Sequence, residues 1–208
     1  MATEITGQVG AASYGQGQSG MPFRQGNQGD IIASQLHGAY YEQTVRGKIF
    51  SCANQTGVTT TVALATTYTG LCLTNPPGSG KNLVLLHAGF SLSVAPAAIP
   101  TYGLMGGFGA VTHTTPLIVK QNLVNNAMTA SVGGAVGLVD SSATIPTPVF
   151  LAPLFSANTS AALPVTPYPG FMPIDGAFIV APGAFIAIYT LAVAVGYGYF
   201  SWEEVELV

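Results

Sequence analysis

Charged side chains are scarce in this sequence. It carries 5 basic and 8 acidic residues among 208, or 6%, whereas ordinary soluble domains carry about a quarter. Five basic residues and a net charge of −3 are too few for a nucleic-acid-binding surface. A free monomer of this size normally needs more charge to stay soluble. We therefore consider a membrane, disorder or an assembly as the reason for the missing charge.

The sequence also lacks the segments that define membrane, secreted and disordered proteins. A hydrophobic content of 49% with 10% aromatic residues excludes global disorder. The best candidate for a transmembrane helix, 176–200, is interrupted by Pro182 and Gly183, so we expect none. The first residues show no basic region followed by an apolar core, so we expect no secretory signal. Burial in an assembly remains.

Cysteine and histidine are too few and too scattered for a metal site. Cys52 and Cys72 lie in apolar, strand-like surroundings. We expect both to be reduced and buried, with a disulfide as the alternative. His37, His87 and His113 have no spacing typical of metal ligands. We expect neither a metal nor a cofactor.

One motif invites comparison with a nucleotide-binding loop. The stretch 75–86 reads NPPGSGKNLVLL, and a P-loop requires G-x-x-x-x-G-K-[ST] between a strand and a helix. Asn75 stands where the first glycine belongs, and Asn82 where the magnesium-binding hydroxyl belongs. The sequence therefore predicts a tight turn between two strands. We expect Gly80 to have a positive φ and Lys81 to be a surface residue of little energetic weight.

The pattern along the chain predicts an all-β protein with an extended N-terminal arm. Residues 1–30 hold seven glycines and five glutamines and no periodicity, which is typical of an arm. Residues 31–208 form one domain of short apolar runs separated by Gly, Pro and Thr, which indicates an antiparallel sandwich or barrel. Strands are expected at 38–50, 52–54, 59–65, 70–74, 82–94, 111–119, 129–132, 135–139, 177–180, 184–195 and 197–208.

The remaining segments are expected to be irregular or uncertain in type. Residues 31–36 form a strand or a brief turn, and 120–128 is the one polar segment that could be helical. The stretches 96–109 and 144–173 are rich in Ala, Pro and Gly and are expected to be irregular. Loops longer than about 12–15 residues are usually functional or packed on a partner, and we favour packing between subunits.

No constellation in the sequence points to catalysis. The nucleophile motif G-x-S-x-G is absent. The C-terminal stretch SWEEVELV alternates Glu204 and Glu206 with Val205 and Leu207, which predicts an edge strand with a solvated acidic face. Trp202 is expected to be a core residue or an interface anchor. We expect a protein that is not an enzyme, although a hydrolase using the C-terminal glutamates is a rival.

The arm is expected to carry assembly. Phe23 is its most apolar anchor and Tyr14 a weaker one, while Arg24 either pairs with an acidic group of a neighbouring subunit or is solvated. Tyr40 and Tyr41, beyond the arm, and Trp202 complete the set of expected interface residues.

Three stretches resemble structural proteins of tailed bacteriophages. They are MPFRQGNQGDIIASQLHGAYYEQTVRGKIFSCA (21–53), TGLCLTNPPGSGKNLVLL (69–86) and SWEEV (201–205). The resemblance covers roughly the first ninety residues and the last ten, and leaves about 100–175 unmatched. It implies a turn at 75–81 that is structural.

The resemblance implies a capsid decoration, or cement, protein. Such a protein would be a jelly-roll-like β-sandwich, made in the host cytoplasm and located on the capsid surface of the virion. Its partners would be the major capsid protein and further copies of itself, in a homotrimer, with no nucleic acid and no membrane. The alternative is a head-fibre or tail-tip adhesin that binds host surface glycans.

Overall fold

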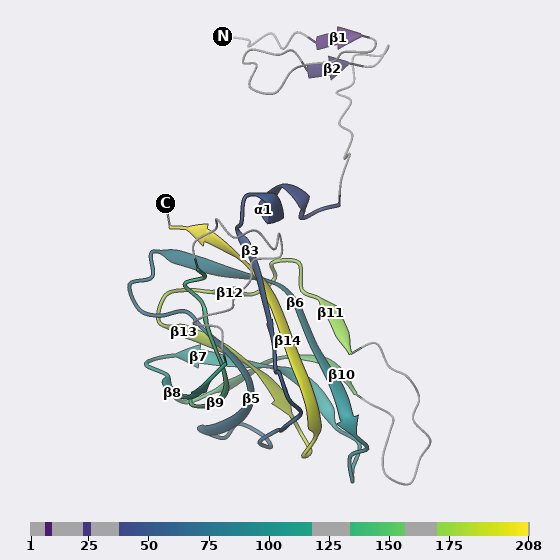
Figure 1. Ribbon diagram of the computed structural model, residues 1–208, viewed down its shortest axis with the longest axis vertical. Helices are drawn as coiled ribbons and strands as arrows, with labels where there is room; N and C mark the ends of the chain where they lie inside the picture. Colours follow the sequence, from purple (N-terminus) through teal and green to yellow (C-terminus); the bar gives the residue numbers. More distant parts are fainter. Residues whose placement is uncertain (1–6, 10–22, 26–37, 118–133, 157–169, 208) are drawn as a thin grey trace. The chain divides into compact units, whose positions relative to one another are not determined.

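The computed structural model describes residues 7–9, 23–25, 38–117, 134–156 and 170–207 (Figure 1). The chain divides into two units, Met1–Tyr41 and Glu42–Val208. In the first unit, β1 (Gly7–Val9) pairs in parallel with β2 (Phe23–Gln25). The predictions for Tyr14, 31–36, 120–128 and 129–132 lie outside the described residues, and so does the domain boundary expected between 30 and 31.

The second unit is built almost entirely of antiparallel strands, with one short helix, α1 (Tyr41–Val45), at its start. Its strands are β3 (Ile49–Ala53), β4 (Val58–Thr59), β5 (Thr67–Thr74), β6 (Lys81–Val94), β7 (Thr101–Phe108), β8 (Thr112–Pro116), β9 (Leu138–Thr144), β10 (Val149–Ser156), β11 (Phe171–Pro173), β12 (Ile179–Val180), β13 (Ala184–Thr190) and β14 (Val195–Glu206).

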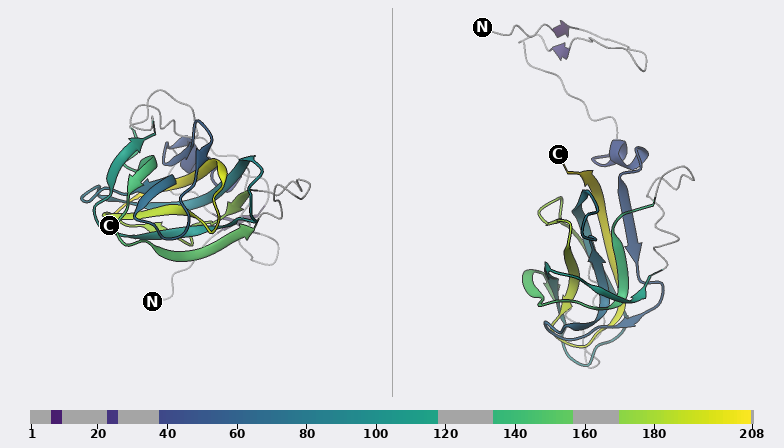
Figure 2. Two further views of the ribbon diagram at one scale, coloured as in Figure 1. Left: turned by 90° about the horizontal axis from the view of Figure 1, so that it is seen from below. Right: turned by 90° about the vertical axis from the view of Figure 1, so that its left-hand side faces the viewer.

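These strands form two sheets that pack as a sandwich (Figure 2). The β6/β14 sheet has the order β11–β6–β14–β3, with β12 on β6 and β4 on β14. The β7/β13 sheet has the order β10–β7–β13–β5–β9–β8. The orders β3–β14–β6–β11 and β5–β13–β7–β10, in which the chain passes repeatedly from one sheet to the other, are those of a jelly roll. The predicted antiparallel, jelly-roll-like sandwich is confirmed.

The core lies between the sheets and follows the two-residue alternation of the strands. Leu83, Leu85 and Phe90 of β6 meet Phe200 and Trp202 of β14 in one buried cluster. The β7/β13 sheet is also covered on its other face, where a second cluster includes Tyr68, Met105 and Phe185. Burial on both faces explains why β13 reads AFIAIYT, an almost continuous apolar run.

Four sequence-based assignments were wrong. The irregular stretch expected at 144–173 contains β10 and β11, because proline is tolerated in strands at the edge of a sheet and both lie there. The strand expected at 38–50 is α1 followed by the start of β3. Within the strand expected at 59–65, only Thr59, the last residue of β4, is in a strand. The irregular stretch expected at 96–109 contains β7, a strand with β10 on one side and β13 on the other. Its glycines were taken as breakers, yet they allow close packing: a Cβ at Gly106 would lie 2.6 Å from the carbonyl oxygen of Phe185.

The two longest strands correct one further expectation and confirm another. The edge strand expected at SWEEVELV belongs to β14, which pairs with β6 on one side and β3 on the other. The strand expected at 82–94 is confirmed as β6. Among the described residues, no helix is long and apolar enough to cross a membrane.

Candidate functional site

The loop that resembles a P-loop is a connection between the two sheets. It links the end of β5 to the start of β6, and Gly78 and Gly80 have φ values of 74° and 72°, as glycine allows. The buried amide of Asn75 donates hydrogen bonds from Nδ2 to the carbonyl oxygens of Lys81 and Val180, both at 2.8 Å. Asn75 therefore ties the loop to β12, and the prediction of a structural turn is confirmed.

Lys81 forms an ion pair with a buried carboxylate, so its ammonium group is not free to bind a phosphate. Its Nζ lies 3.2 Å from Oε2 of Glu204, whose side chain is fully buried. The other carboxylate oxygen accepts hydrogen bonds from the backbone N–H groups of Val136 (2.8 Å) and Gly137 (3.1 Å) and from Nε1 of Trp202 (3.4 Å). Both oxygens of Glu204 are thus committed to the fold. The expected solvated position was wrong for Glu204 but right for Glu206, which is exposed. The expected surface role of Lys81 was wrong.

A charged hollow of about 380 Å³ lies beside this pair. It is lined by Gln43 and Arg46 of the α1 region, by Lys48, and by the glutamates of β14 at 203, 204 and 206. Lys48 pairs with Glu206 at 3.3 Å, and both side chains are exposed. Charges of opposite sign alternate here. Glu204 is sealed from solvent, so it cannot serve as one of the two accessible carboxylates that a hydrolase of this kind uses.

Two histidine side chains are hydrogen-bonded to groups on neighbouring strands. His87 Nδ1 lies 2.8 Å from Ser201 Oγ, but Ser201 is buried and out of reach of a substrate. His113 Nδ1 bonds Asp140 Oδ2 and links β8 to β9. No group of three or more metal-ligating side chains occurs within the described part of the chain.

The two thiols are unpaired and unreactive. Both cysteines are free, as expected; Cys72 is buried and Cys52 half-buried. Burial raises the pKa of Cys52 and of Cys72 from 9.0 to about 12, because desolvation penalises the thiolate. Neither thiol therefore supplies a nucleophile near neutral pH.

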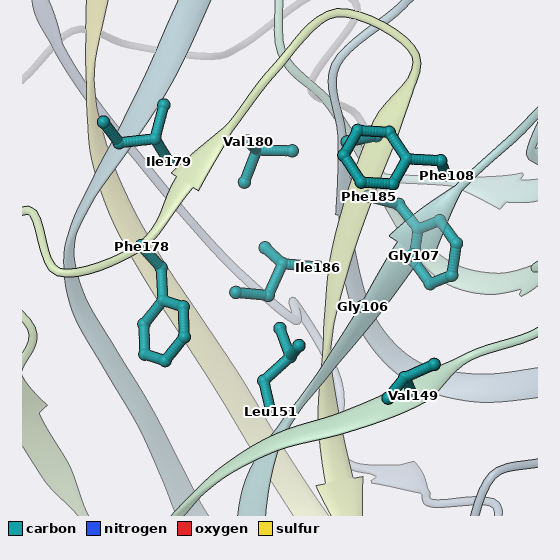
Figure 3. Close-up of a pocket in the computed structure, with 11 residues that line it drawn as sticks. Gly106, Gly107, Phe108, Val149, Leu151, Phe178, Ile179, Val180, Phe185 and Ile186 are labelled. Carbon is teal, nitrogen blue, oxygen red and sulfur yellow. The ribbon is translucent and has the colours of Figure 1, made fainter.

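An apolar cleft of about 320 Å³ opens between strands of the two sheets (Figure 3). It lies where β10 and β12, outer strands of the two sheets, face each other. Its walls come from 106–108 of β7, Val149 and Leu151 of β10, 178–180 around β12, and 184–186 of β13. None of these residues is charged. Figure 3 shows Phe178, Ile186 and Leu151 pointing into the cavity.

The β6/β14 sheet carries a row of aromatic side chains on its outer face. Phe171 of β11 stacks on His87 of β6, with ring centroids 4.7 Å apart, and lies 5.7 Å from the ring of Tyr199. Tyr197 and Phe171 are both exposed. A sheet face with accessible aromatic rings is a surface on which a sugar ring can stack. No signal in the sequence indicated this aromatic row, because its members come from three strands that are far apart in the chain.

The expected interface residues are placed unevenly by the structure. Phe23 and Arg24 lie in β2, whose side chains are not described, while Tyr40 is half-buried and Tyr41 exposed. Trp202 has 0% exposure and stacks against Phe50 in the core of its own chain. The prediction that Trp202 is an interface anchor was therefore wrong, and the alternative prediction, that it is a core residue, is confirmed.

Comparison of the chain with family models, with curated proteins and with solved structures found no match.

Proposed function

We propose that this chain is a non-enzymatic virion protein that binds the lattice of a major capsid protein as a homo-oligomer and stabilises the head. The observation that carries the proposal is an aliphatic loop surface without charge, at the end of the jelly roll away from most of its charged residues. Arg46, Lys48, Lys81 and the three glutamates of β14 gather at one end, near α1 in Figure 1. Among the side chains described, Asp140 and Asp175 are the charged residues outside this group.

The loops 60–66, 94–100 and 190–194 form a surface that we call the aliphatic end. They are joined by hydrogen bonds from Ala63 N to Thr190 O and from Leu191 N to Thr101 O, both 3.0 Å, and by pairing of Val94 with Val195. Their exposed aliphatic side chains are those of Val62, Leu64, Val94, Ile99, Leu191 and Val193.

The composition of the aliphatic end favours a protein partner. The loop sequences TTVALAT (60–66), VAPAAIP (94–100) and TLAVA (190–194) contain no aromatic and no basic residue. Interfacial membrane binding relies on both of those types, and nucleic-acid binding relies on basic residues. An uncharged protein surface can cover these side chains without desolvating a charge. We assign the aliphatic end to contact with the capsid lattice.

Energetics favour attachment as an oligomer. Six partly exposed aliphatic side chains present on the order of 400 Å² of apolar surface, or about 10 kcal/mol on burial. Association costs on the order of 4–15 kcal/mol, so one subunit alone binds the lattice weakly. Copies joined in an oligomer bind together and gain from effective concentration. The resemblance to phage decoration proteins implies three copies.

The proposal is tested on heads that lack this protein. The purified full-length chain should bind them and appear in a particle map as density on the outer capsid surface. Leu191→Asp and Val193→Asp place a charge on the aliphatic end and should abolish binding, whereas Lys48→Ala, at the opposite end, should bind normally. Density at the tail tip, or equal binding by all three variants, would overturn the proposal.

The second candidate is an adhesin that binds host surface glycans, and the aromatic row favours it. In that case Tyr197→Ala and Phe171→Ala should abolish binding to host cell-wall polysaccharide, while Leu191→Asp should not affect it. A glycan array probed with the full-length chain separates the candidates, because a decoration protein binds none of the glycans.

A further inference from the structure

The apolar cleft lies beside an unusually exposed phenylalanine. Phe108, the last residue of β7, is 76% exposed and stands at the rim of the cleft that it helps to line. Ile179 of β12 is 59% exposed on the opposite wall. Single exposed apolar residues are ordinary, but an exposed ring next to an apolar hollow of suitable size calls for an explanation.

The backbone holds Phe108 in place. Phe108 pairs with Ala184 of β13, and the next residue, Gly109, donates a hydrogen bond from its N–H to the carbonyl oxygen of Gly183 at 2.9 Å. Gly109 has a φ of 128°, a conformation that β-carbon-bearing residues rarely adopt. The ring is therefore presented from a fixed backbone, which lowers the entropy lost when it is buried by a partner.

We propose that the apolar cleft receives the Phe108 ring of a second copy of this chain, in a two-fold symmetric dimer. A dry apolar cavity of about 150 Å³ is known to hold a benzene molecule, so the cleft, at about 320 Å³, accommodates a phenyl ring. The projecting ring and the hollow belong to one surface. A two-fold axis is the symmetry that brings a surface against itself, so each Phe108 enters the cleft of the other copy.

The size of the apolar rim is sufficient for a stable dimer. Phe108, Val149, Leu151 and Ile179 are all exposed and together present on the order of 400 Å² of apolar area, within the range of the largest patch on a monomer. Two copies would bury about 800 Å², which is the apolar content of a standard interface of roughly 1,400 Å².

The absence of charge from the rim of the cleft also favours a second copy of this chain as the partner. A two-fold contact brings each group close to its own copy, so a charged rim would repel itself. No residue lining the cleft is charged, and no charge needs to be desolvated when two rims meet.

This inference concerns a different surface from the aliphatic end and does not rest on the virion role. It also differs from the resemblance, which implies a trimer. Leu191 lies next to the start of β7, where its N–H bonds Thr101 O, whereas Phe108 ends the same strand. At about 3.3 Å per residue, the two positions are on the order of 20 Å apart, so their variants report on separate surfaces.

The test is the mass of the full-length chain in solution, measured by sedimentation equilibrium over a range of concentrations. The unmodified protein should have twice the mass of one 21.2 kDa chain. Phe108→Asp and Ile179→Asp should weaken the dimer at least about a hundredfold, as expected for a central anchor. Leu191→Asp should leave it unchanged. Circular dichroism melting of each variant establishes that the fold is retained.

The following results would contradict the proposed dimer. A monomer, a three-copy particle, or a dimer that Phe108→Asp leaves intact would overturn it. A monomer that binds the apolar dye 8-anilinonaphthalene-1-sulfonate, with binding lost in Ile179→Asp, would assign the cleft to a small apolar ligand instead. Loss of the dimer with retained head binding, or the reverse, separates this inference from the proposed function.

Discussion

Glu204 shows how strongly one buried carboxylate constrains this fold. It is one of two acidic side chains buried among the described residues, the other being Asp140. Its three N–H donors come from a loop before β9 and from β14 itself, and its cation, Lys81, comes from the first residue of β6. Such a group is costly to leave without partners, so these segments must fold together around it.

Lys81→Ala should therefore destabilise the protein by about 2–4 kcal/mol, because it removes the cation from a buried ion pair. The estimate lies toward the low end because Glu204 keeps its three N–H donors. Lys48→Ala is the matched control, since its pair with Glu206 is exposed and worth at most about 1 kcal/mol. Urea unfolding curves of both variants measure the difference, and equal losses would refute it.

From the sequence, a positive φ at Gly80 and a surface position of Lys81 predict that Gly80→Val is more harmful than Lys81→Ala. The buried partner of Lys81 reverses this order. A Cβ at Gly80 would meet no atom within 4 Å. Its cost is then the positive φ alone, about 1–2 kcal/mol.

The thiols give a pH-dependent prediction. Folding raises the pKa of Cys52 and Cys72 from 9.0 to about 12. The unfolded chain therefore loses these protons first, and the contribution to stability is lost as the pH rises from about 9 to about 12. At about pH 8, a thiol reagent should label neither residue in the native protein and both in denaturant. Rapid labelling of the native protein would contradict the burial.

At the scale of the element, glycine marks close approach between strands rather than interruption. Gly196 of β14 sits where β14 and β6 shift register, and a Cβ there would lie 2.1 Å from the carbonyl oxygen of Ser91. Gly89 and Gly170 form a similar contact, since a Cβ at Gly89 would lie 2.5 Å from Gly170 O. Side chains at these positions would push the strands apart.

Gly196→Ala should accordingly destabilise the sandwich by about 2–4 kcal/mol, within the upper range for strained substitutions. Gly134→Ala is the control, because a Cβ at Gly134 would meet no atom within 4 Å. Thermal unfolding should show a clear fall in Tm for the first variant and little change for the second. A Gly196→Ala protein as stable as the control would show that β6 and β14 separate easily.

At the scale of the whole molecule, the chain divides into two units, Met1–Tyr41 and Glu42–Val208. Every buried hydrophobic residue identified in the described part of the chain lies at Ile49 or later, so the sandwich has a core without the arm. The arm, by its Gly- and Gln-rich composition, has no core of its own.

Deletion of residues 1–30 should leave the Tm of the sandwich nearly unchanged while weakening attachment to heads. Ordering some thirty residues costs about 1–2 kcal/mol each, so an arm that carries assembly must offset that cost by contacts with a partner. Calorimetry measures the first effect and a head-binding assay the second. Normal attachment of the truncated chain would show that the arm is passive.

Local patterns in the sequence were sufficient for the class of fold and for the turn at 75–81. Alternation along β6 and punctuation by Gly and Pro act within a few residues, and such signals survive without knowledge of the tertiary structure. The failed match of Asn75 and Asn82 to a P-loop likewise depended on spacing alone.

The candidate sites were decided by packing between distant segments. The partners of Glu204 lie 67, 68 and 123 residues away in the chain, and the cleft joins residues of β7, β10, β12 and β13. Alternation in SWEEVELV is the same for an edge strand and for a central one, because a strand's periodicity reports which faces are apolar and not which neighbours lie beside it. Only the pairing of β14 with both β3 and β6 makes Glu204 a buried anchor, and only the packing of the two sheets leaves Phe108 exposed beside an apolar hollow.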